Sequence, residues 1–229
     1  STFRLVQTGR LASVVRFVGE GGQGAVYEVA AGGERYALKW YHPVMATPSQ
    51  HQAIATLVEW GPPSDRFLWP LEMAELSGRD SFGYVMPLRP ARFRQLRDLL
   101  HNRVPVSWTV RTTVCMELAH HFFLLHSFGL CYRDISIANI FFDPADGAVL
   151  ICDNDNVAVN DGSPSVVRGT PLFMAPEVVR GEGQPSTATD LYSLAVLLFY
   201  VLMAGHPLIG RNVPDWTLQE RHPQAFGFD

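Results

Sequence analysis

The chain has 229 residues, 47% of them hydrophobic and 17% charged, and its formal net charge is −4 at pH 7. This composition is typical of a folded globular protein and argues against a disordered chain. The basic residues are scattered, so no nucleic-acid partner is expected. Cys115, Cys131 and Cys152 lie in apolar stretches, and their odd number favours free thiols in a reducing cytoplasm over a disulfide framework.

Neither a secretory signal nor a membrane segment is expected. The first twenty residues lack a basic region followed by an apolar one. The longest apolar run, residues 191–204, is shorter than the about 20 residues that a membrane-spanning helix needs. We therefore expect a cytoplasmic protein, and the sequence does not indicate an oligomeric state.

The first part of the chain is rich in predicted strands. Runs of β-branched and aromatic residues predict strands at 14–18 and 25–29, joined by a glycine cluster, and at 36–40. Apolar residues at positions 53, 54, 57 and 58 predict a helix over 49–60. Further strands are predicted at 67–73 and 82–86.

After Pro87 the pattern becomes mainly helical. A long apolar helix is predicted over 108–127, and a second over 187–204 is apolar on almost all sides and is expected to be central. Short strands are predicted on either side of Asp146-Gly147, a favourable tight-turn pair. An α+β fold with a boundary near 87–90 follows from this change of pattern.

Two groups of residues indicate phosphate chemistry. The segment from Gly19 to Gly24 matches G-x-G-x-x-G, and glycines let main-chain N–H groups approach phosphates. These glycines lie between predicted strands, which disfavours a Rossmann site, whereas a glycine-rich hairpin without a ligand stays open as an alternative. Lys39 ends the next predicted strand and is either a phosphate ligand or a solvated edge charge.

The second group follows the long predicted helix. Asp134 and Asn139 lie five residues apart, and Asp153 follows the apolar run 148–152. Taken separately, each aspartate could be a turn or capping residue. Any one of these residues could stand there by chance, but their order along the chain is harder to explain in that way.

With these residues, the segment Gly169-Thr170-Pro171-Leu172-Phe173-Met174-Ala175-Pro176-Glu177 and Asp190, the sequence resembles the protein kinase family from about Val14 to Pro207. The resemblance implies a two-lobed protein kinase fold. Residues 1–87 would form a small β-rich N-terminal lobe, and residues 88–229 a larger helical C-terminal lobe that is expected to be truncated. It implies transfer of the ATP γ-phosphate to a protein hydroxyl in signalling, as in a bacterial eukaryotic-like kinase.

The resemblance also implies roles for single residues. Asp134 would act as the base, and Asn139 and Asp153 would hold Mg²⁺, with Mn²⁺ as an alternative. The catalytic group would be Asp134, Lys39, Asn139 and Thr170. The ATP-binding group would be Gly19, Gly21, Gly22, Gly24, Val26, Ala37, Lys39 and the hinge residues Met86, Pro87 and Arg89.

Other residues would be regulatory or structural. Arg133 would pair with a phosphate on Ser163 or Ser165, or is an ordinary loop arginine. Asp190 would support the catalytic loop through hydrogen bonds to its main chain, and Thr170 would contact the catalytic aspartate. Glu59 would pair with Lys39, or is a solvated carboxylate near a helix end. The family position of Glu177 normally pairs with a later arginine, and His120, His121 and His126 are expected to be packed or solvated.

The sequence departs from the family pattern at two places in the predicted site. Asp153-Asn154-Asp155 replaces Asp-Phe-Gly, so we expect the flipped, inactive state of this segment to be less accessible. Ser136 replaces a lysine near the base. The leading hypothesis is a serine/threonine kinase, favoured over a tyrosine kinase by Gly169-Thr170. The alternative is a pseudokinase that acts as a nucleotide-binding or interaction scaffold. Residues 169–177 disfavour a small-molecule kinase.

Overall fold

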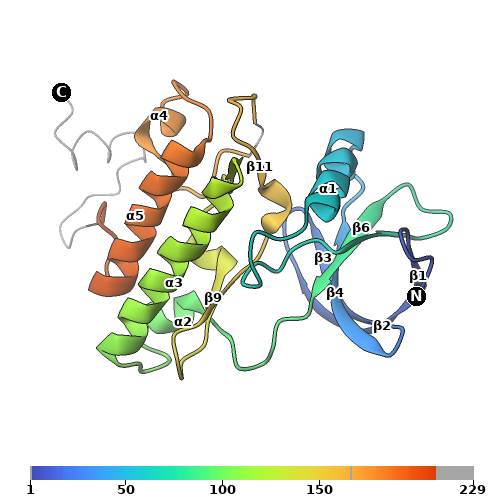
Figure 1. Ribbon diagram of the computed structural model, residues 1–229, viewed down its shortest axis with the longest axis horizontal. Helices are drawn as coiled ribbons and strands as arrows, with labels where there is room; N and C mark the ends of the chain where they lie inside the picture. The colour runs from blue at the N-terminus through green and yellow to red at the C-terminus, as the bar shows by residue number, and fades with distance from the viewer. Residues whose placement is uncertain (1, 166, 210–229) are drawn as a thin grey trace. The chain divides into compact units, whose positions relative to one another are not determined.

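The computed structural model describes residues 2–165 and 167–209. The chain divides into two compact units, Ser1–Pro90 and Ala91–Asp229, which we call the N-terminal unit and the C-terminal unit. Both are seen in Figure 1. The division at Pro90 lies within the stretch where the sequence pattern changes. The expectation of a truncated C-terminal lobe concerns the chain after residue 209, which lies outside the described residues.

A closed six-stranded barrel forms most of the N-terminal unit. Its strands, in spatial order, are β1 (Thr2–Leu5), β2 (Leu11–Glu20), β3 (Gly24–Ala31), β4 (Glu34–Tyr41), β6 (Phe82–Pro87) and β5 (Glu72–Glu75). All neighbouring strands are antiparallel, and β1 closes the barrel by pairing with both β2 and β5. The strands predicted at 14–18, 25–29, 36–40 and 82–86 are confirmed. The strand β1 was not predicted, because four residues are too few to show a periodicity of their own.

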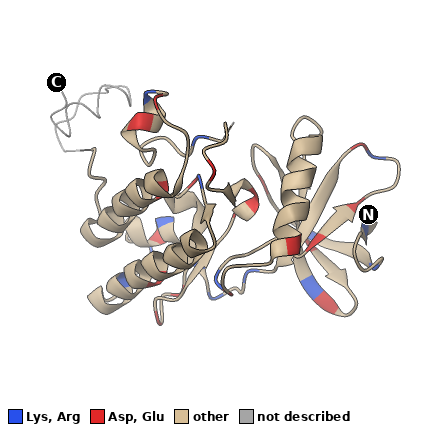
Figure 2. Ribbon diagram, turned by 45° about the horizontal axis from the view of Figure 1, so that its top comes forward, with Lys and Arg blue, Asp and Glu red and all other residues tan. Residues whose placement is uncertain are grey.

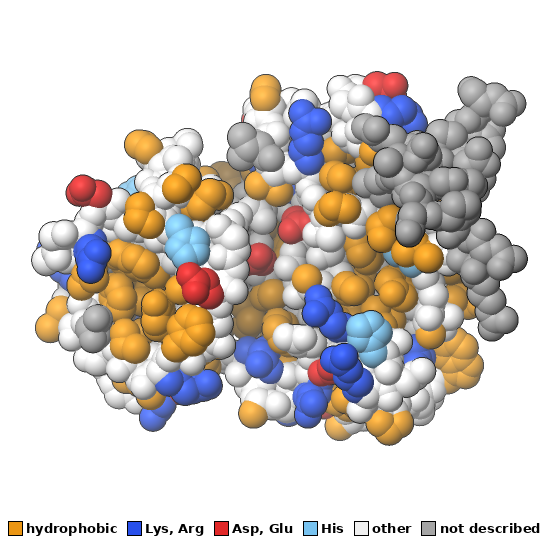
Figure 3. Space-filling model, turned by 180° about the vertical axis from the view of Figure 1, so that it is seen from behind, with side chains coloured by type: hydrophobic (Ala, Val, Ile, Leu, Met, Phe, Trp, Pro, Cys, Tyr) orange, Lys and Arg blue, Asp and Glu red, His pale blue; other side chains and the backbone are white. Residues whose placement is uncertain are grey.

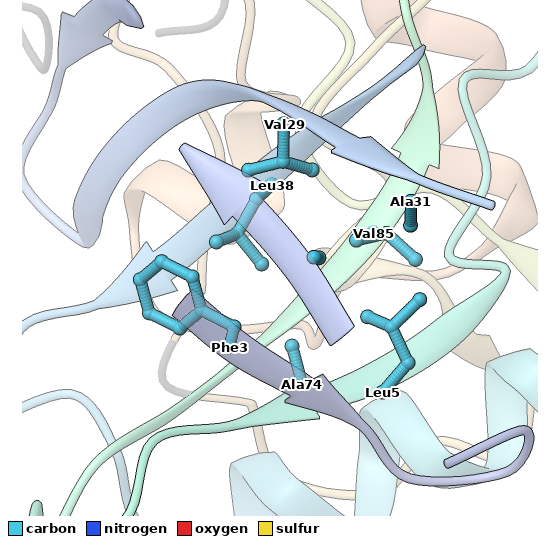
Figure 4. Packing of buried hydrophobic residues seen from close by; sticks show 8 residues of the cluster. Phe3, Leu5, Val29, Ala31, Leu38, Ala74 and Val85 are labelled. Carbon is cyan, nitrogen blue, oxygen red and sulfur yellow. The ribbon is translucent and has the colours of Figure 1, made fainter. Parts of the chain in front are cut away.

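The interior of the barrel is an apolar core. Alternate side chains of each strand point to the same face, so one face of every strand contributes to this core. Figure 4 shows the buried side chains directed into the barrel from several strands. The cluster consists of Phe3, Leu5, Ala12, Val29, Ala31, Leu38, Ala74 and Val85.

The predicted strand over 67–73 is wrong for most of its length. Only Glu72 and Met73 belong to β5, and residues 67–71 are outside any strand. Phe67 and Trp69 are fully buried, and the indole Nε1 of Trp69 donates to the carbonyl of Leu57 at 2.8 Å. The apolar character of this segment therefore comes from packing beside a helix, not from membership of a sheet.

That helix, α1 (Pro48–Trp60), confirms the predicted helix over 49–60. Thr47 caps its first turn, because its hydroxyl accepts a hydrogen bond from the main-chain N–H of Gln50 at 3.2 Å. Gly61 ends the helix with a φ of 74°. The helix buries Ile54 and Leu57, which are two of the apolar positions that predicted it.

The C-terminal unit is mainly helical. Its elements are β7 (Arg94–Gln95), α2 (Leu96–Leu100), α3 (Trp108–Ser127), β8 (Leu130–Cys131), η1 (Ile137–Asn139), β9 (Ile140–Phe142), β10 (Val149–Ile151), η2 (Asn154–Asn156), β11 (Ala158–Val159), α4 (Pro176–Val179) and α5 (Thr187–Met203). The long helices α3 and α5 lie side by side (Figure 1). Both predicted helices and the hairpin around Asp146-Gly147 are confirmed.

The helix α5 is less enclosed than its sequence suggested. It packs against α3, α2 and β8, and buries Leu194, Leu197 and Val201. Three other apolar side chains of the helix, Leu191, Phe199 and Met203, are exposed. Exposed hydrophobic side chains are visible on both units in Figure 3. The described elements therefore cover only part of the surface of α5, so the prediction that it is central holds for one side.

The charged residues do not gather in one part of either unit. Acidic and basic residues are interspersed along the elements of both units (Figure 2). Within residues 2–165 and 167–209, no helix combines the length and the apolar character that crossing a bilayer requires. The three cysteines are free thiols; Cys115 and Cys131 are buried and Cys152 is half-buried.

Candidate functional site

The carboxylate of Asp134 is held from two sides. Asp134 lies in the loop between β8 and η1. The hydroxyl of Thr170 donates to its Oδ1 at 2.6 Å, and the amide Nδ2 of Asn139 donates to its Oδ2 at 3.2 Å. The same Nδ2 donates to the main-chain carbonyl of Asp134 at 2.9 Å. These bonds fix the orientation of the Asp134 carboxylate relative to the short helix η1.

Asp190 anchors the loop that carries Asp134. It lies in the first turn of α5 and is 2% exposed. Its two carboxylate oxygens accept hydrogen bonds from the main-chain N–H groups of Tyr132, at 2.6 Å, and Arg133, at 2.9 Å. Arg133 has a φ of 73°, a conformation that non-glycine residues rarely adopt. The buried carboxylate therefore stabilises a loop conformation that is unfavourable by itself.

His126 is a third partner of Asp190, and sequence reasoning missed it. Its Nε2 lies 3.0 Å from Oδ2 of Asp190. We expected the histidines of this helix to be packed or solvated, because nothing in their spacing pointed to a partner. The one relevant signal is the position of His126 in the last turn of α3, immediately before the loop that Asp190 supports.

Asn139 and Asp153 lie at the same end of one β-hairpin. Asn139 comes just before its first strand, β9, and Asp153 comes shortly after its second strand, β10. The strands β9 and β10 pair, and the N–H of Cys152 donates to the carbonyl of Asn139 at 2.9 Å. Asp153 follows with φ 58° and ψ 41°, in the left-handed region. Because Nδ2 of Asn139 faces Asp134, its amide oxygen is directed away from that carboxylate. An amide oxygen and a carboxylate are hard donors, so this pair fits a divalent cation such as Mg²⁺.

Two buried side chains hold the segment around Asp153. The phenol of Tyr132 donates to the carbonyl of Cys152, and burial raises the pKa of Tyr132 well above its ordinary value, so this donor stays protonated. Asn154 is fully buried, and its Nδ2 donates to the carbonyl of Ile151 at 3.1 Å. The residue that replaces the usual phenylalanine thus makes a polar contact that ties η2 to β10.

The structure does not join Arg133 to the two serines predicted as its phosphorylated partners. Ser163 donates its N–H to Asp161 Oδ1 at 2.9 Å, and the hydroxyl of Ser165 donates to the carbonyl of Val167 at 2.7 Å. The Nε of Arg133 is buried and has no hydrogen-bond partner among the residues that the structure describes. The hydrogen bond from the Ser163 N–H lowers the pKa of Asp161, and the charge of Arg133 contributes to a smaller degree.

Glu177 lies near α5. It is in the short helix α4, and a Cβ atom on Gly183 would be 3.1 Å from the Cγ of Glu177. Burial raises the pKa of Tyr192 to about 12, and the charge of Glu177 adds to this effect. Glu177 is therefore close to Tyr192 in the C-terminal unit, and no arginine partner for it is found within the described residues.

The second group of predicted site residues shares one face of the barrel wall. Val26 and Lys39 are paired across β3 and β4, and Ala37 and Met86 are paired across β4 and β6. Directly paired residues of antiparallel strands point to the same side. Lys39 is 5% exposed, and its Nζ donates to Oε1 of Gln23 at 2.7 Å. The candidate phosphate ligand therefore contacts the glycine-rich segment itself and is not a solvated edge charge.

The glycine-rich segment consists of the end of β2, the turn that follows and the first residue of β3. Within it, the N–H of Gly21 donates to the carbonyl of Gly24 at 2.9 Å. Gly19, Gly21 and Gly22 have open space where a Cβ atom would lie, whereas a Cβ on Gly24 would overlap the main chain of Trp40. Of these four positions, only position 24 must be glycine for the strands to pack. At the other three, the absence of a side chain leaves the main chain open to a neighbouring group.

Two further predictions concern the ends of elements. The structure does not bring Glu59 to Lys39, because Glu59 is exposed at the C-terminal end of α1 and forms no ion pair with the described residues. The reading of Glu59 as a solvated helix-end carboxylate is the one that fits. Met86 and Pro87 end β6, and the exposed Arg89 follows.

Known proteins match the chain over most of its length. The family model described as a protein kinase domain matches residues 12–224. The serine/threonine-protein kinase chk-2 of Caenorhabditis elegans is 31% identical over 132 residues, which are 56% of this chain and 28% of that protein. The DNA damage-responsive serine/threonine-protein kinase RqkA of Deinococcus radiodurans is 27% identical over 209 residues, 86% of this chain and 30% of that protein.

A second bacterial relative gives a similar result. The serine/threonine-protein kinase PknK of Mycobacterium bovis is 31% identical over 145 residues, which are 62% of this chain and 12% of that protein. The chain therefore spans less than a third of the length of each of these three relatives.

Proposed function

Because the chain belongs to the protein kinase family, we propose that it transfers the γ-phosphate of ATP to serine or threonine hydroxyls of proteins. The observation that carries this proposal is the Asp134 carboxylate, oriented by Thr170 at 2.6 Å and by Asn139 at 3.2 Å. A carboxylate oxygen has more than one acceptor position, so Asp134 keeps the capacity to accept from a substrate hydroxyl.

Asp134 is proposed as the base that orients the substrate hydroxyl and accepts its proton. Phosphoryl transfer depends mainly on positioning and on charge stabilisation, with little covalent chemistry by the protein. The bonds from Thr170 and Asn139 provide that positioning, because they restrain both carboxylate oxygens. Asp190 acts one step further away, since it fixes the main chain of Tyr132 and Arg133 immediately before the base.

Asn139 and Asp153 are proposed as the ligands of Mg²⁺, with Mn²⁺ as an alternative. A divalent ion supplies neutralisation of the charge on the ATP phosphates. Asn139 contributes through its amide oxygen, because its amide nitrogen is engaged by Asp134. Tyr132 and Asn154 restrain the main chain on both sides of Asp153, which favours one conformation of the metal-binding segment.

In the N-terminal unit, Lys39 is proposed to hold the α- and β-phosphates beneath the segment from Gly19 to Gly24. The exchange of the Gln23 contact for a phosphate keeps the buried ammonium hydrogen-bonded. Val26, Ala37 and Met86 line the same face and provide apolar contacts for adenine, next to the hinge at Pro87 and Arg89.

The test is a phosphotransfer assay on the purified chain with radiolabelled ATP, MgCl₂ and a generic basic protein. Asp134→Asn is expected to lower transfer at least about 100-fold, since it removes the base. Asp146→Asn, an exposed turn aspartate that keeps its acceptor oxygen, is the matched control and is expected to behave as wild type. Equal labelling by wild type and Asp134→Asn, with autophosphorylation included, contradicts the proposal.

A nucleotide-binding scaffold without phosphotransfer is the second candidate. Ser136, at the position where the family has a lysine, is fully buried and brings no positive charge. Glu59 does not reach Lys39, so the ion pair expected for an active kinase is not formed by that residue. Calorimetric binding of MgATP by a chain that transfers no phosphate would favour this candidate.

A further inference from the structure

Lys39 lies over an aromatic ring in the N-terminal unit. Tyr41 is two residues further along β4, so both side chains point to the same face of the strand. The Nζ of Lys39 is 5.6 Å from the centroid of the Tyr41 ring, which is within the range of a cation–π interaction. Both side chains are almost fully buried, so the ring restricts the positions open to the ammonium group.

Tyr41 is itself held firmly. Its ring contacts the rings of Phe82, at 5.0 Å between centroids, and Tyr84, at 6.2 Å. Its main-chain carbonyl accepts a hydrogen bond from the hydroxyl of Ser81 at 2.7 Å. The place of the Tyr41 ring beside Lys39 therefore depends on these packing contacts and on what holds its hydroxyl group.

The hydroxyl of Tyr41 connects this ring to helix α1. The amide Nε2 of Gln50 donates to Tyr41 Oη at 3.1 Å. Gln50 is in the first turn of α1, and Thr47 caps its main-chain N–H. The contact therefore joins the start of the helix to the strand that carries Lys39. Glu59 is at the opposite end of the helix and makes no such contact.

We propose that Gln50 and Tyr41 are positioning residues for Lys39, which couple helix α1 to the phosphate-binding lysine through a neutral hydrogen bond and an aromatic ring. The proposal rests on the proposed function, since it assigns Lys39 to the phosphates of ATP. A displacement of the first turn of α1 pulls on Tyr41 Oη, and the Tyr41 ring then changes the position available to Lys39. The bond between the Gln50 amide and the Tyr41 hydroxyl joins two uncharged groups, and in this it differs from an ion pair between a helix carboxylate and Lys39.

The experiment compares four single variants. Gln50→Leu removes the donor, and Tyr41→Phe keeps the ring but removes the hydroxyl. Each is expected to lower kcat/KM for ATP about threefold to tenfold, as for the loss of one hydrogen bond. Gln50→Glu is expected to retain activity near wild type, because the Tyr41 hydroxyl can donate to a carboxylate. Glu59→Gln, in the same helix, is the matched control and is expected to have no effect.

Two combinations test whether the residues act through one another. The double variant Gln50→Leu with Tyr41→Phe is expected to be no worse than either single variant, because both remove the same bond. In a Lys39→Ala background, Gln50→Leu is expected to leave the MgATP Kd unchanged. A purely structural role would still weaken binding in that background, and a melting curve of each variant shows whether it is folded.

The outcomes separate the two proposals. If wild type binds MgATP but transfers no phosphate, the proposed function fails, and the MgATP Kd of the variants still decides the positioning role. Weaker MgATP binding by Gln50→Leu and Tyr41→Phe, with rescue by Gln50→Glu, supports it. Wild-type kinetics and Kd for folded Gln50→Leu and Tyr41→Phe, or additive losses in the double variant, overturn it. Wild type without affinity for MgATP overturns both proposals.

Discussion

The carbonyl group of Trp40 occupies the space that a Cβ atom on Gly24 would need. The two residues belong to paired strands, since Gly24 is opposite Tyr41 and Ala25 is opposite Trp40. The last glycine of the glycine-rich segment is therefore determined by the packing of main chain against main chain.

Gly24→Ala is expected to destabilise the N-terminal unit by about 1–3 kcal/mol, because the strands must separate to admit the methyl group. Gly22→Ala is the matched control, since it has open space and an ordinary φ. Urea unfolding followed by tryptophan fluorescence measures both. Equal midpoints for the two variants would contradict the packing argument.

Thr170→Val is expected to lower kcat about tenfold or more, because it removes a hydrogen bond to a charged carboxylate. Thr170→Ser keeps the hydroxyl and is expected to retain most activity. Steady-state kinetics at saturating ATP measure the change. Similar kcat values for Thr170→Val and wild type would show that the 2.6 Å bond does not orient Asp134 during turnover.

Asp190→Asn is expected to lower the free energy of unfolding by about 3 kcal/mol. The amide can accept through one oxygen only, so its NH₂ group must face one of the two main-chain N–H donors, of Tyr132 or Arg133. His126→Phe removes only one contact of Asp190 and is expected to cost less. Denaturant unfolding followed by circular dichroism compares them, and a larger effect for His126→Phe would reverse this ranking.

The stability of the C-terminal unit is expected to fall as the pH rises from about 9 to 11. Burial raises the pKa of Cys115 from 9.0 to about 11, so in this window the folded state keeps a proton that the unfolded state has lost. Stability from this group is thus complete below pH 9 and is lost as pH approaches 11. Cys115→Ala removes this titration.

The measurement for Cys115 is the slope of unfolding free energy against pH, since the substitution also changes packing. A less negative slope between pH 9 and 11 in Cys115→Ala is the expected result. An identical slope in both proteins would show that the thiol is ionised equally easily in the folded and unfolded states.

The sequence predicted elements well where the pattern was local. The helices at 108–127 and 187–204 and the strands on either side of the glycine-rich segment were recognised from periodicity and turn residues. The closure of the barrel was not, because it depends on the pairing of Arg4 and Leu5 with Glu75 and Ala74, far along the chain. The strand predicted over 67–71 was wrong because apolar residues are selected both by burial beside α1 and by burial in a sheet. The sequence of this segment alone does not distinguish the two.

The candidate site was predictable to the extent that its residues belong to a recognisable family motif. Asp134, Asn139 and Thr170 were named from a family resemblance, and the structure brings them into contact. Gln50 and His126 were not foreseen, because a neutral amide and a helix-end histidine carry no pattern in one sequence. Glu59 illustrates the converse, since a negative charge in the expected helix suggested a partner for Lys39 although it points to solvent.

The strand β1 gives every strand of the barrel two hydrogen-bonded neighbours. An open sheet presents a row of unsatisfied main-chain groups along its margin, and such rows recruit other chains into aggregates. Deletion of residues 2–5 would turn β2 and β5 into edge strands with unpaired main-chain N–H and C=O groups. We therefore expect the shortened chain to aggregate more readily than the full chain, which light scattering of both would measure.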